Sequence, residues 1–323
     1  MEALAAGIPA IKKRKSIRTH LSEFMAQKDL QMMVLPWMVF IIIFSYLPMY
    51  GLIMAFQNYQ LGDLPGLSKF VGLEHFKMFF SSADFMPVMR NTFAISFLKL
   101  FFAFPAPILF AILLNEVSGI YFKRTIQTIS YLPHFVSWVV VAGLTFDFLS
   151  PDGGALNAFL VNLGSIKETV TFMAVPRYFW TITVVTDIWK DIGWNAIIYI
   201  AAIASIDNEL YQAADIDGAG RLRKIWHITL SGIKPTIVIL LIINISNLLS
   251  SGFEQILLLT NNLTNTTVQD VADVIDTYVY RTGIMQMRYS YATAAGLFKS
   301  VFSIVLLTLA NYGARWFGEE SLW

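Results

Sequence analysis

Charged residues are scarce in this chain and cysteine is absent. Of the 323 residues, 14% are Asp, Glu, Lys or Arg, and the lack of cysteine excludes disulfides and thiolate metal sites. Apolar residues make up 56% of the sequence, and the mean hydropathy is +0.59. This composition is too apolar for an ordinary soluble domain and places the chain in a lipid bilayer.

Nucleotide-binding and catalytic motifs are also missing. No G-x4-G-K-[ST] phosphate-binding loop occurs, so a nucleotide would have to be handled by another protein. The four histidines are scattered, and no H-E-x-x-H or Ser/His/Asp grouping accompanies them. We therefore expect a non-enzymatic protein with no catalytic residue, no metal, no cofactor bound by this chain and no nucleic-acid partner.

Six apolar segments are long enough to cross the hydrocarbon core, which takes about 20 residues of helix. Pro105, Pro107 and Pro133 fall inside the second and third segments and predict kinks there. The prediction is an all-α integral membrane protein with one transmembrane domain over 31–316. The six segments are 31–56, 88–114, 125–149, 178–204, 235–259 and 291–316.

Lysine and arginine are distributed unevenly between the connecting segments. If the N-terminus is inside the cell, the inner segments hold 13 Lys and Arg residues and the outer loops hold six. Because cytoplasmic loops carry the excess of basic residues, we expect both ends, 1–30 and 317–323, in the cytoplasm, together with the loop 207–232. The basic tail 1–30 is either solvated or forms a short helix at the membrane interface.

The loop 207–232 has strong local helix signals. Asp207 is a good N-cap residue, and Gly218 supplies the left-handed residue that commonly ends a helix, so we predict a short helix of about nine or ten residues. Arg221 to Leu230 predicts a second, amphipathic helix that leads back to the membrane. We expect that helix to stop at Gly232 and Pro235.

The same loop resembles a known signature, the pattern EAA-x3-G-x9-I-x-L-P of binding-protein-dependent ABC importer permeases. The matching residues are Ala213, Ala214, Gly218, Ile228 and Leu230, while Gln212 replaces the Glu and Ser231 replaces the Pro. Other segments, spread over nearly the whole chain, resemble sugar-importer permeases of the maltose and complex-oligosaccharide type, most like the branch that handles polysaccharide fragments, aldouronates and alginate. These segments are 70–76, 91–92, 131–133 and 292–298.

The resemblance implies a fold and a set of partners. The fold is that of a type I ABC importer permease with cytoplasmic coupling helices, in a multi-pass protein of the bacterial plasma (inner) membrane. The partners are a second homologous permease, two ATPase subunits that bind ATP and Mg, an extracytoplasmic solute-binding protein, an oligosaccharide and membrane lipid. The ATPase would grip the first short helix of the loop. The implied coupling residues are Glu209, Tyr211, Gln212, Ala213, Ala214, Asp217, Gly218, Ile228 and Leu230.

Three charged residues lie deep in the fourth apolar segment. Asp187, Lys190 and Asp191 are near the middle of the bilayer at the rise of an α-helix. Because a charge facing lipid is costly, they should face the bundle interior or water, and Asp187 can pair with Lys190 three residues on. They either line a solute pathway or simply lock helices together, and the sequence leaves both open.

A polar stripe follows in the fifth segment, where Asn244, Asn247 and Ser251 recur on one helix face. Amides hydrogen-bond sugar hydroxyls, and Trp194 or Trp138 could stack on pyranose rings, so a carbohydrate pathway is indicated, although the amides could equally hold helices together. Two further residues, Lys99 and Lys299, lie near mid-depth and would add positive charge suited to an acidic oligosaccharide.

An alternative function is a secondary transporter or channel that uses the intramembrane Asp and Lys residues for ion coupling. Such a protein is expected to show internal symmetry, and we find no convincing sequence repeat. It also does not need a capped cytoplasmic helix with the spacing seen here. The importer permease is therefore the preferred prediction.

Overall fold

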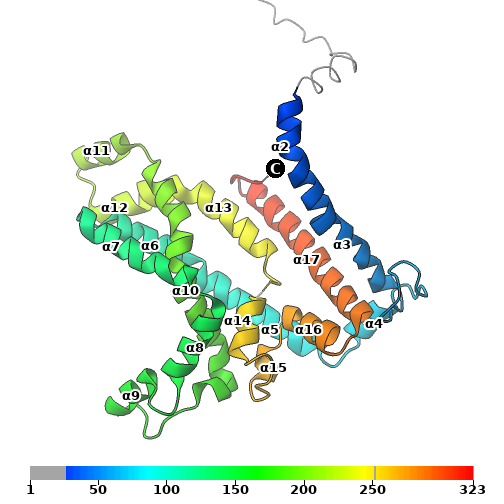
Figure 1. Ribbon diagram of the computed structural model, residues 1–323. Helices are drawn as coiled ribbons and strands as arrows, with labels where there is room; N and C mark the ends of the chain where they lie inside the picture. The colour runs from blue at the N-terminus through cyan, green and yellow to red at the C-terminus, as the bar shows by residue number, and fades with distance from the viewer. Residues whose placement is uncertain (1–26, 251, 323) are drawn as a thin grey trace, which may run out of the picture. The chain divides into compact units, whose positions relative to one another are not determined.

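The computed structural model describes residues 27–250 and 252–322 (Figure 1). Every regular element in these ranges is helical, and the extended pairing among them is limited to an isolated bridge between Gln57 and Phe70. The all-α prediction is therefore confirmed. The prediction for the basic tail 1–30 falls outside the described residues except at its end, where a helix begins at Lys28.

The chain divides into two compact units, Met1–Ile53 and Met54–Trp323. In the first unit the described part is helical, and its helix runs on without a break as far as Phe56. The length of 29 residues and the apolar sequence of Lys28–Phe56 suit a membrane span. Its successive elements are α2 (Lys28–Ile41), η1 (Ile42–Tyr46), α3 (Leu47–Met49) and η2 (Tyr50–Phe56).

The second unit contains the remaining long helices, with α10 between α6 and α13 (Figure 1). Its first run, Phe85–Asn115, includes a π-helical turn just before Pro105, so the helix is irregular there but continuous. The elements that make up its long helical runs are α5 (Phe85–Leu98), η3 (Lys99–Ala103), α6 (Pro105–Asn115), α10 (Pro176–Ala204), α12 (Arg221–Lys224), η6 (Ile225–Thr229), α13 (Leu230–Ser246) and α17 (Tyr289–Trp316).

Four helical runs among the described residues are long and apolar enough to cross a membrane, and a bent pair makes a possible fifth. The helix α10 is long enough as well, with 29 residues, but Asp187, Lys190 and Asp191 reduce its apolar character. The chain is thus a multi-pass membrane protein, while the six-span count and the orientation stay predictions. The four runs are Lys28–Phe56, Phe85–Asn115, Arg221–Ser246 and Tyr289–Trp316.

The third predicted span, 125–149, bends at the kink predicted for Pro133, and the bend divides the segment into two helical parts. It consists of α7 (Ile120–Tyr131) with η4 (Leu132–Phe135), and of α8 (Trp138–Leu149), bent by 102° relative to each other. Pro133 lacks an N–H and so weakens the helix at this point. Ser137 then restarts it as an N-cap, since its backbone is extended and its hydroxyl accepts from the Val140 N–H.

The fifth predicted span, 235–259, is also broken. The helix α13 ends at Ser246, and α14 (Phe253–Leu259) starts after Gly252, whose φ of +89° is left-handed. The prediction that the second helix of the loop stops at Gly232 and Pro235 is wrong, because both residues lie inside α13.

The glycine at position 232 is explained by helix packing and not by a helix end. A Cβ atom there would lie 2.6 Å from Cδ1 of Ile206, which follows α10. The glycine therefore lets α13 approach the end of α10 closely.

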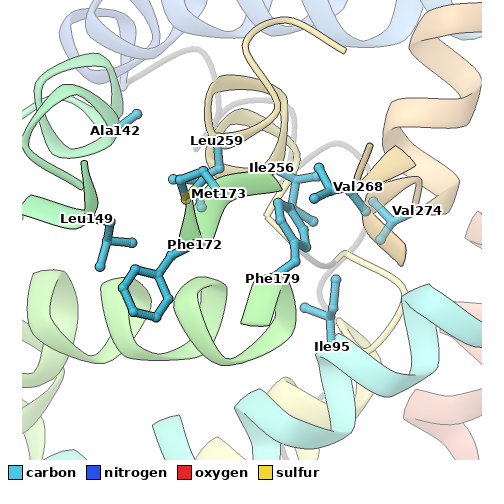
Figure 2. Packing of buried hydrophobic residues seen from close by; sticks show 11 residues of the cluster. Ile95, Ala142, Leu149, Phe172, Met173, Phe179, Ile256, Leu259, Val268 and Val274 are labelled. Carbon is cyan, nitrogen blue, oxygen red and sulfur yellow. The ribbon is translucent and has the colours of Figure 1, made fainter. Parts of the chain in front are cut away.

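Short helices connect the long ones. Two of them, α15 and α16, are separated by Asp273 and Val274. A buried apolar cluster joins the segments that follow the two breaks, α8 and α14, to α5 and α10 (Figure 2). The elements are α4 (Glu74–Phe80), α9 (Ala155–Asn162), η5 (Phe172–Ala174), α15 (Gln269–Ala272), α16 (Ile275–Tyr280) and η7 (Arg281–Met285).

Gly193 provides a test of the packing between α10 and α7. A Cβ atom at Gly193 would lie 2.1 Å from the Ser130 backbone oxygen, so Gly193→Ala forces the two backbones apart and should destabilise the protein by about 1–3 kcal/mol. Gly143→Ala is the matched control, since its Cβ in α8 would meet nothing within 4 Å. Thermal unfolding of the purified protein should show a lower midpoint for the first variant, and equal midpoints would contradict this packing.

Candidate functional site

A cavity of about 440 Å³ with a mixed polar and apolar lining lies where the broken helices meet α10. Its volume falls in the range of small-ligand pockets. Side chains reach it from the second, fourth and fifth apolar segments and from the start of α8. Its polar lining residues are Ser96, Lys99, Trp138, Asp187, Asp191, Asn195, Tyr199, Asn244, Asn247, Ser250 and Gln255.

Lys99 is the centre of a network that crosses three helices. Its Nζ donates to Asp187 Oδ1 at 2.6 Å and to Gln255 Oε1 at 2.7 Å, and the Gln255 amide donates to the Thr183 carbonyl at 2.7 Å. A Cβ atom at Gly252 would lie 3.0 Å from Nζ, so the glycine leaves room for the ammonium group. The network joins η3, α10 and α14, and the positive charge of Lys99 is already neutralised.

The predicted pairing of Asp187 with Lys190 is wrong, because Lys99 takes the carboxylate. Lys190 is 6% exposed and is not part of the cavity lining. Its Nζ donates instead to the backbone carbonyls of His134 at 2.6 Å and Val136 at 2.7 Å. This cation therefore satisfies carbonyls at the break between η4 and α8.

Asp191 and Trp194 both engage His134, a residue that the sequence analysis assigned no role. Asp191 Oδ1 lies 2.7 Å from His134 Nδ1, and the His134 ring stacks on Trp194 with centroids 4.3 Å apart and planes 2° apart. Asp191 lines the cavity but Trp194 does not, and Trp138 is the tryptophan that does. The position of His134 directly after Pro133, at the predicted kink, was the available signal.

The two amides of the predicted polar stripe, Asn244 and Asn247, line the cavity and are exposed to it. The Asn244 amide also donates to the Leu240 carbonyl on its own helix at 2.8 Å. Ser251 lies outside the described residues. Lys299 is not in the lining and pairs with Asp276, so the structure does not bring it to this cavity.

The sequence analysis missed Asn195 and Gln255 as lining residues. Asn195 follows Asp191 by four residues on α10, so helix periodicity would have placed both on one face. Gln255 gave no such signal, because it reaches the cavity only through the break before α14.

The loop 207–232 forms the predicted short helix, α11 (Asn208–Ile216). The Asp207 carboxylate caps it by accepting from the Glu209 N–H at 2.9 Å, and Gly218 follows with φ +71°. The Tyr211 hydroxyl lies 2.9 Å from the Thr229 hydroxyl, which ties α11 to η6. The second helix, α12 with η6, continues directly into α13.

The nine predicted coupling residues divide into four groups. Glu209, Gln212 and Ala213 are exposed on α11. Leu230 packs against the apolar cluster of α6, α10 and α13 and is half-buried. A hollow of about 380 Å³ next to the loop includes Ala214, Asp217 and Ile228 among its lining residues, and Tyr211 and Gly218 hold the helix as described above.

A further contact links this loop to the second apolar segment. The Arg221 guanidinium binds the Glu116 carboxylate and donates to the Glu116 carbonyl at 2.6 Å, at the end of α6. Together with the Tyr211 contact to Thr229, it fixes the loop to two long helices.

A helical membrane protein with a cavity between broken helices and a loop that forms a capped short helix has the architecture of a transport permease. The sequence profile of the family described as "Binding-protein-dependent transport system inner membrane component" matches residues 103–319. The chain belongs to this family. It is a permease subunit of a binding-protein-dependent importer.

Curated relatives cover nearly the whole chain. It is 46% identical to the Bacillus subtilis protein LplB, over 91% of each chain. It is 43% identical to the Bacillus subtilis polygalacturonan/rhamnogalacturonan transport system permease protein YteP, over 100% of this chain and 99% of that one.

Solved structures are similar as well. A subunit of a bacterial ABC transporter involved in the import of the acidic polysaccharide alginate matches with a TM-score of 0.83 and 41% identity, over 92% of this chain and 98% of that chain. A structure of the bacterial alginate ABC transporter in complex with an alginate pentasaccharide-bound periplasmic protein matches with a TM-score of 0.84 and 40% identity, over 93% and 99%.

The Lys99 network gives a prediction about stability. Lys99→Met or Asp187→Asn alone leaves one partner uncompensated and should cost about 1–3 kcal/mol, while the double variant should recover part of the loss. The more exposed pair Lys234 and Glu319 is the matched control, and its removal should cost less than about 1 kcal/mol. Thermal unfolding measures all variants, and additive losses at Lys99 and Asp187 would contradict the coupling.

Proposed function

We propose that this permease subunit serves an ATP-driven importer of oligosaccharides or polysaccharide fragments, and that the cavity lined by Lys99, Asp187 and the amide residues is part of the solute pathway. The observation that carries the proposal is the combination of this cavity with the capped helix α11 in one chain of the permease family. A solute site and a site for an energy-supplying partner are the two parts that such a subunit needs.

The chemistry of the cavity supports a sugar as solute. Asn195, Asn244 and Asn247 offer amides to hydroxyl groups, and the Trp138 ring provides a flat apolar face. The relatives named for polygalacturonan, rhamnogalacturonan and alginate point to uronate-containing chains. Because Lys99 is neutralised by Asp187, this half of the pathway would contact hydroxyls and ring faces rather than bind carboxylates through a free cation.

The assembly proposed for the complex contains this chain, a second homologous permease, two ATPase subunits that carry ATP and Mg, and an external binding protein. A periplasmic protein loaded with alginate pentasaccharide is bound in one solved relative, which supports the last partner. The proposed site is the bacterial plasma membrane with both ends in the cytoplasm. The chain itself is proposed to bind no cofactor and to catalyse no reaction.

The helix α11 is proposed to sit in a cleft of the ATPase. Its Ala213 and Ala214 are small, so a partner surface can approach the backbone closely. Closure of the ATPases would move α11, and the contacts of Tyr211 with Thr229 and of Arg221 with Glu116 would pass that movement to α13 and α6. The substitution of Gln212 for the usual Glu leaves a neutral hydrogen-bonding group at this surface.

Ion-coupled transport is the alternative, and the charges argue against it. Within the described residues, the two carboxylates of the cavity are each paired, Asp187 with Lys99 and Asp191 with His134. A secondary transporter would need a carboxylate that gains and loses its ion during the cycle.

The coupling role is tested by two substitutions in the loop. Ala214→Asp places a charge at the hollow, and Gly218→Val strains a residue with φ +71°, so both should abolish solute-stimulated ATPase activity and uptake by the reconstituted complex while membrane insertion continues. Gly164→Val is the matched control, because Gly164 has φ +70° and equally open surroundings but lies in another loop. Stimulation that survives both loop variants would remove the coupling role.

A further inference from the structure

Lys190 is a buried cation at a break in the backbone. Its Nζ donates to the carbonyls of His134 and Val136, and it lies 3.4 Å from the Pro133 carbonyl. The side chain is 6% exposed, and within the described part of the chain its hydrogen-bond acceptors are backbone carbonyls. Burying a lysine ammonium group raises the free energy of the folded state unless its three N–H donors form hydrogen bonds. Here backbone carbonyl oxygens accept those hydrogen bonds.

The position of the Lys190 ammonium group at the C-terminal end of η4 explains why a positive charge is stable there. The helices α7 and η4 end at Phe135, so the His134 carbonyl lies at the C-terminal end, where carbonyls lack helical partners and carry the negative end of the helix dipole, and the Val136 carbonyl follows in the link to α8. At membrane depth such groups must be satisfied within the protein. The Lys190 ammonium does so from α10, and it thereby fixes the 102° bend between α7 and α8.

The same lysine also holds a wall of the cavity. The Lys190 Nζ lies 5.5 Å from the centre of the Trp138 ring, and Trp138 is the first residue of α8 and lines the cavity. The next residue on α10, Asp191, lines the cavity too and is held by His134 from the other side of the break. Lys190 therefore lies directly behind the ring that faces the proposed solute.

We propose that Lys190 is a positioning residue for the solute: its ammonium group holds the broken third segment so that Trp138 presents its ring to the cavity. This inference rests on the proposed function, because it gives the cavity wall a role in solute transfer. Lys190 itself touches no solute. It acts through the break and through Trp138, which distinguishes it from the lining residues.

The test uses the complete complex in proteoliposomes, with alginate pentasaccharide and short galacturonan fragments as probes, each delivered by its binding protein. The quantity measured is the amount of probe imported per ATP hydrolysed. Trp138→Ala should lower this ratio about tenfold, because it removes the apolar ring face that the cavity offers to the solute. Lys190→Met should lower it to a similar degree while basal ATPase activity stays unchanged, because the ring loses its orientation.

Three further variants make the result specific. The double variant Lys190→Met with Trp138→Ala should be no worse than either single change, since both act on the same ring. Lys299→Met is the matched control, because that intramembrane lysine pairs with Asp276 away from the cavity, and it should leave the ratio unchanged. Lys190→Gln keeps amide donors without the charge and should show a smaller fall than Lys190→Met.

The outcomes separate the two proposals. A wild-type complex that imports neither probe contradicts the proposed sugar function. With wild-type import intact, the positioning role is overturned if the ratio in the Lys190 variants equals that of wild type, if import and ATPase activity fall together, or if the double variant shows multiplied losses. It is also overturned if both Lys190 variants fail to assemble while Trp138→Ala assembles, because Lys190 then serves folding alone.

Discussion

Backbone groups inside a membrane must find hydrogen-bond partners within the protein, and this constraint decides how the present chain is built. Two of its apolar segments are broken, near 132–137 and near 247–252. Each break frees backbone groups that water cannot reach from the lipid side. Side chains of neighbouring helices supply the missing partners: Lys190 donates to carbonyls at the first break, and Ser96 donates to the Leu248 carbonyl at the second.

The breaks and the cavity are parts of one arrangement. A helix that stops inside the bundle leaves space beside it, and the cavity lies where α8, α10, α13 and α14 meet. Its charges are paired across different helices, Lys99 with Asp187 and Asp191 with His134. A wet cavity bounded by neutralised charges can admit a polar solute without holding it too tightly to leave.

The loop 207–232 differs from the cavity in that most of its contacts join residues close together in the sequence. The helix α11 is capped at both ends, Tyr211 ties it to η6, which continues into α13, and Arg221 of α12 ties the loop to the end of α6. In the proposed mechanism a motion imposed on α11 is therefore passed to two long helices, and both of them line the cavity at their other ends. This connection is how hydrolysis in a partner would change access to the solute pathway.

The features predicted correctly from the sequence were those determined by residues that are close together in the chain. The helix α11 follows from Asp207 and Gly218, which act within a few residues of themselves. The bend near Pro133 was predicted as a kink, because proline acts locally, whereas the break before α14 was missed, because an apolar run such as 235–259 does not show whether the helix through it is continuous. The pairing of Asp187 was mispredicted because Lys190, three residues away, is a plausible local partner, whereas the actual partner, Lys99, is 88 residues away in sequence and meets it only in the folded bundle.

The central claim is that the broken helices enclose a water-filled pathway that the solute occupies. The natural lack of cysteine allows a direct measurement, in which Asn195→Cys and Asn244→Cys are treated with a water-soluble thiol reagent in the assembled complex, and Ile304→Cys on the exposed face of α17 serves as the control. The account predicts that both cavity cysteines react and that transported sugar protects them, while the control is indifferent to sugar. Cavity cysteines that stay unreactive, or that react equally with and without sugar during transport, would contradict it.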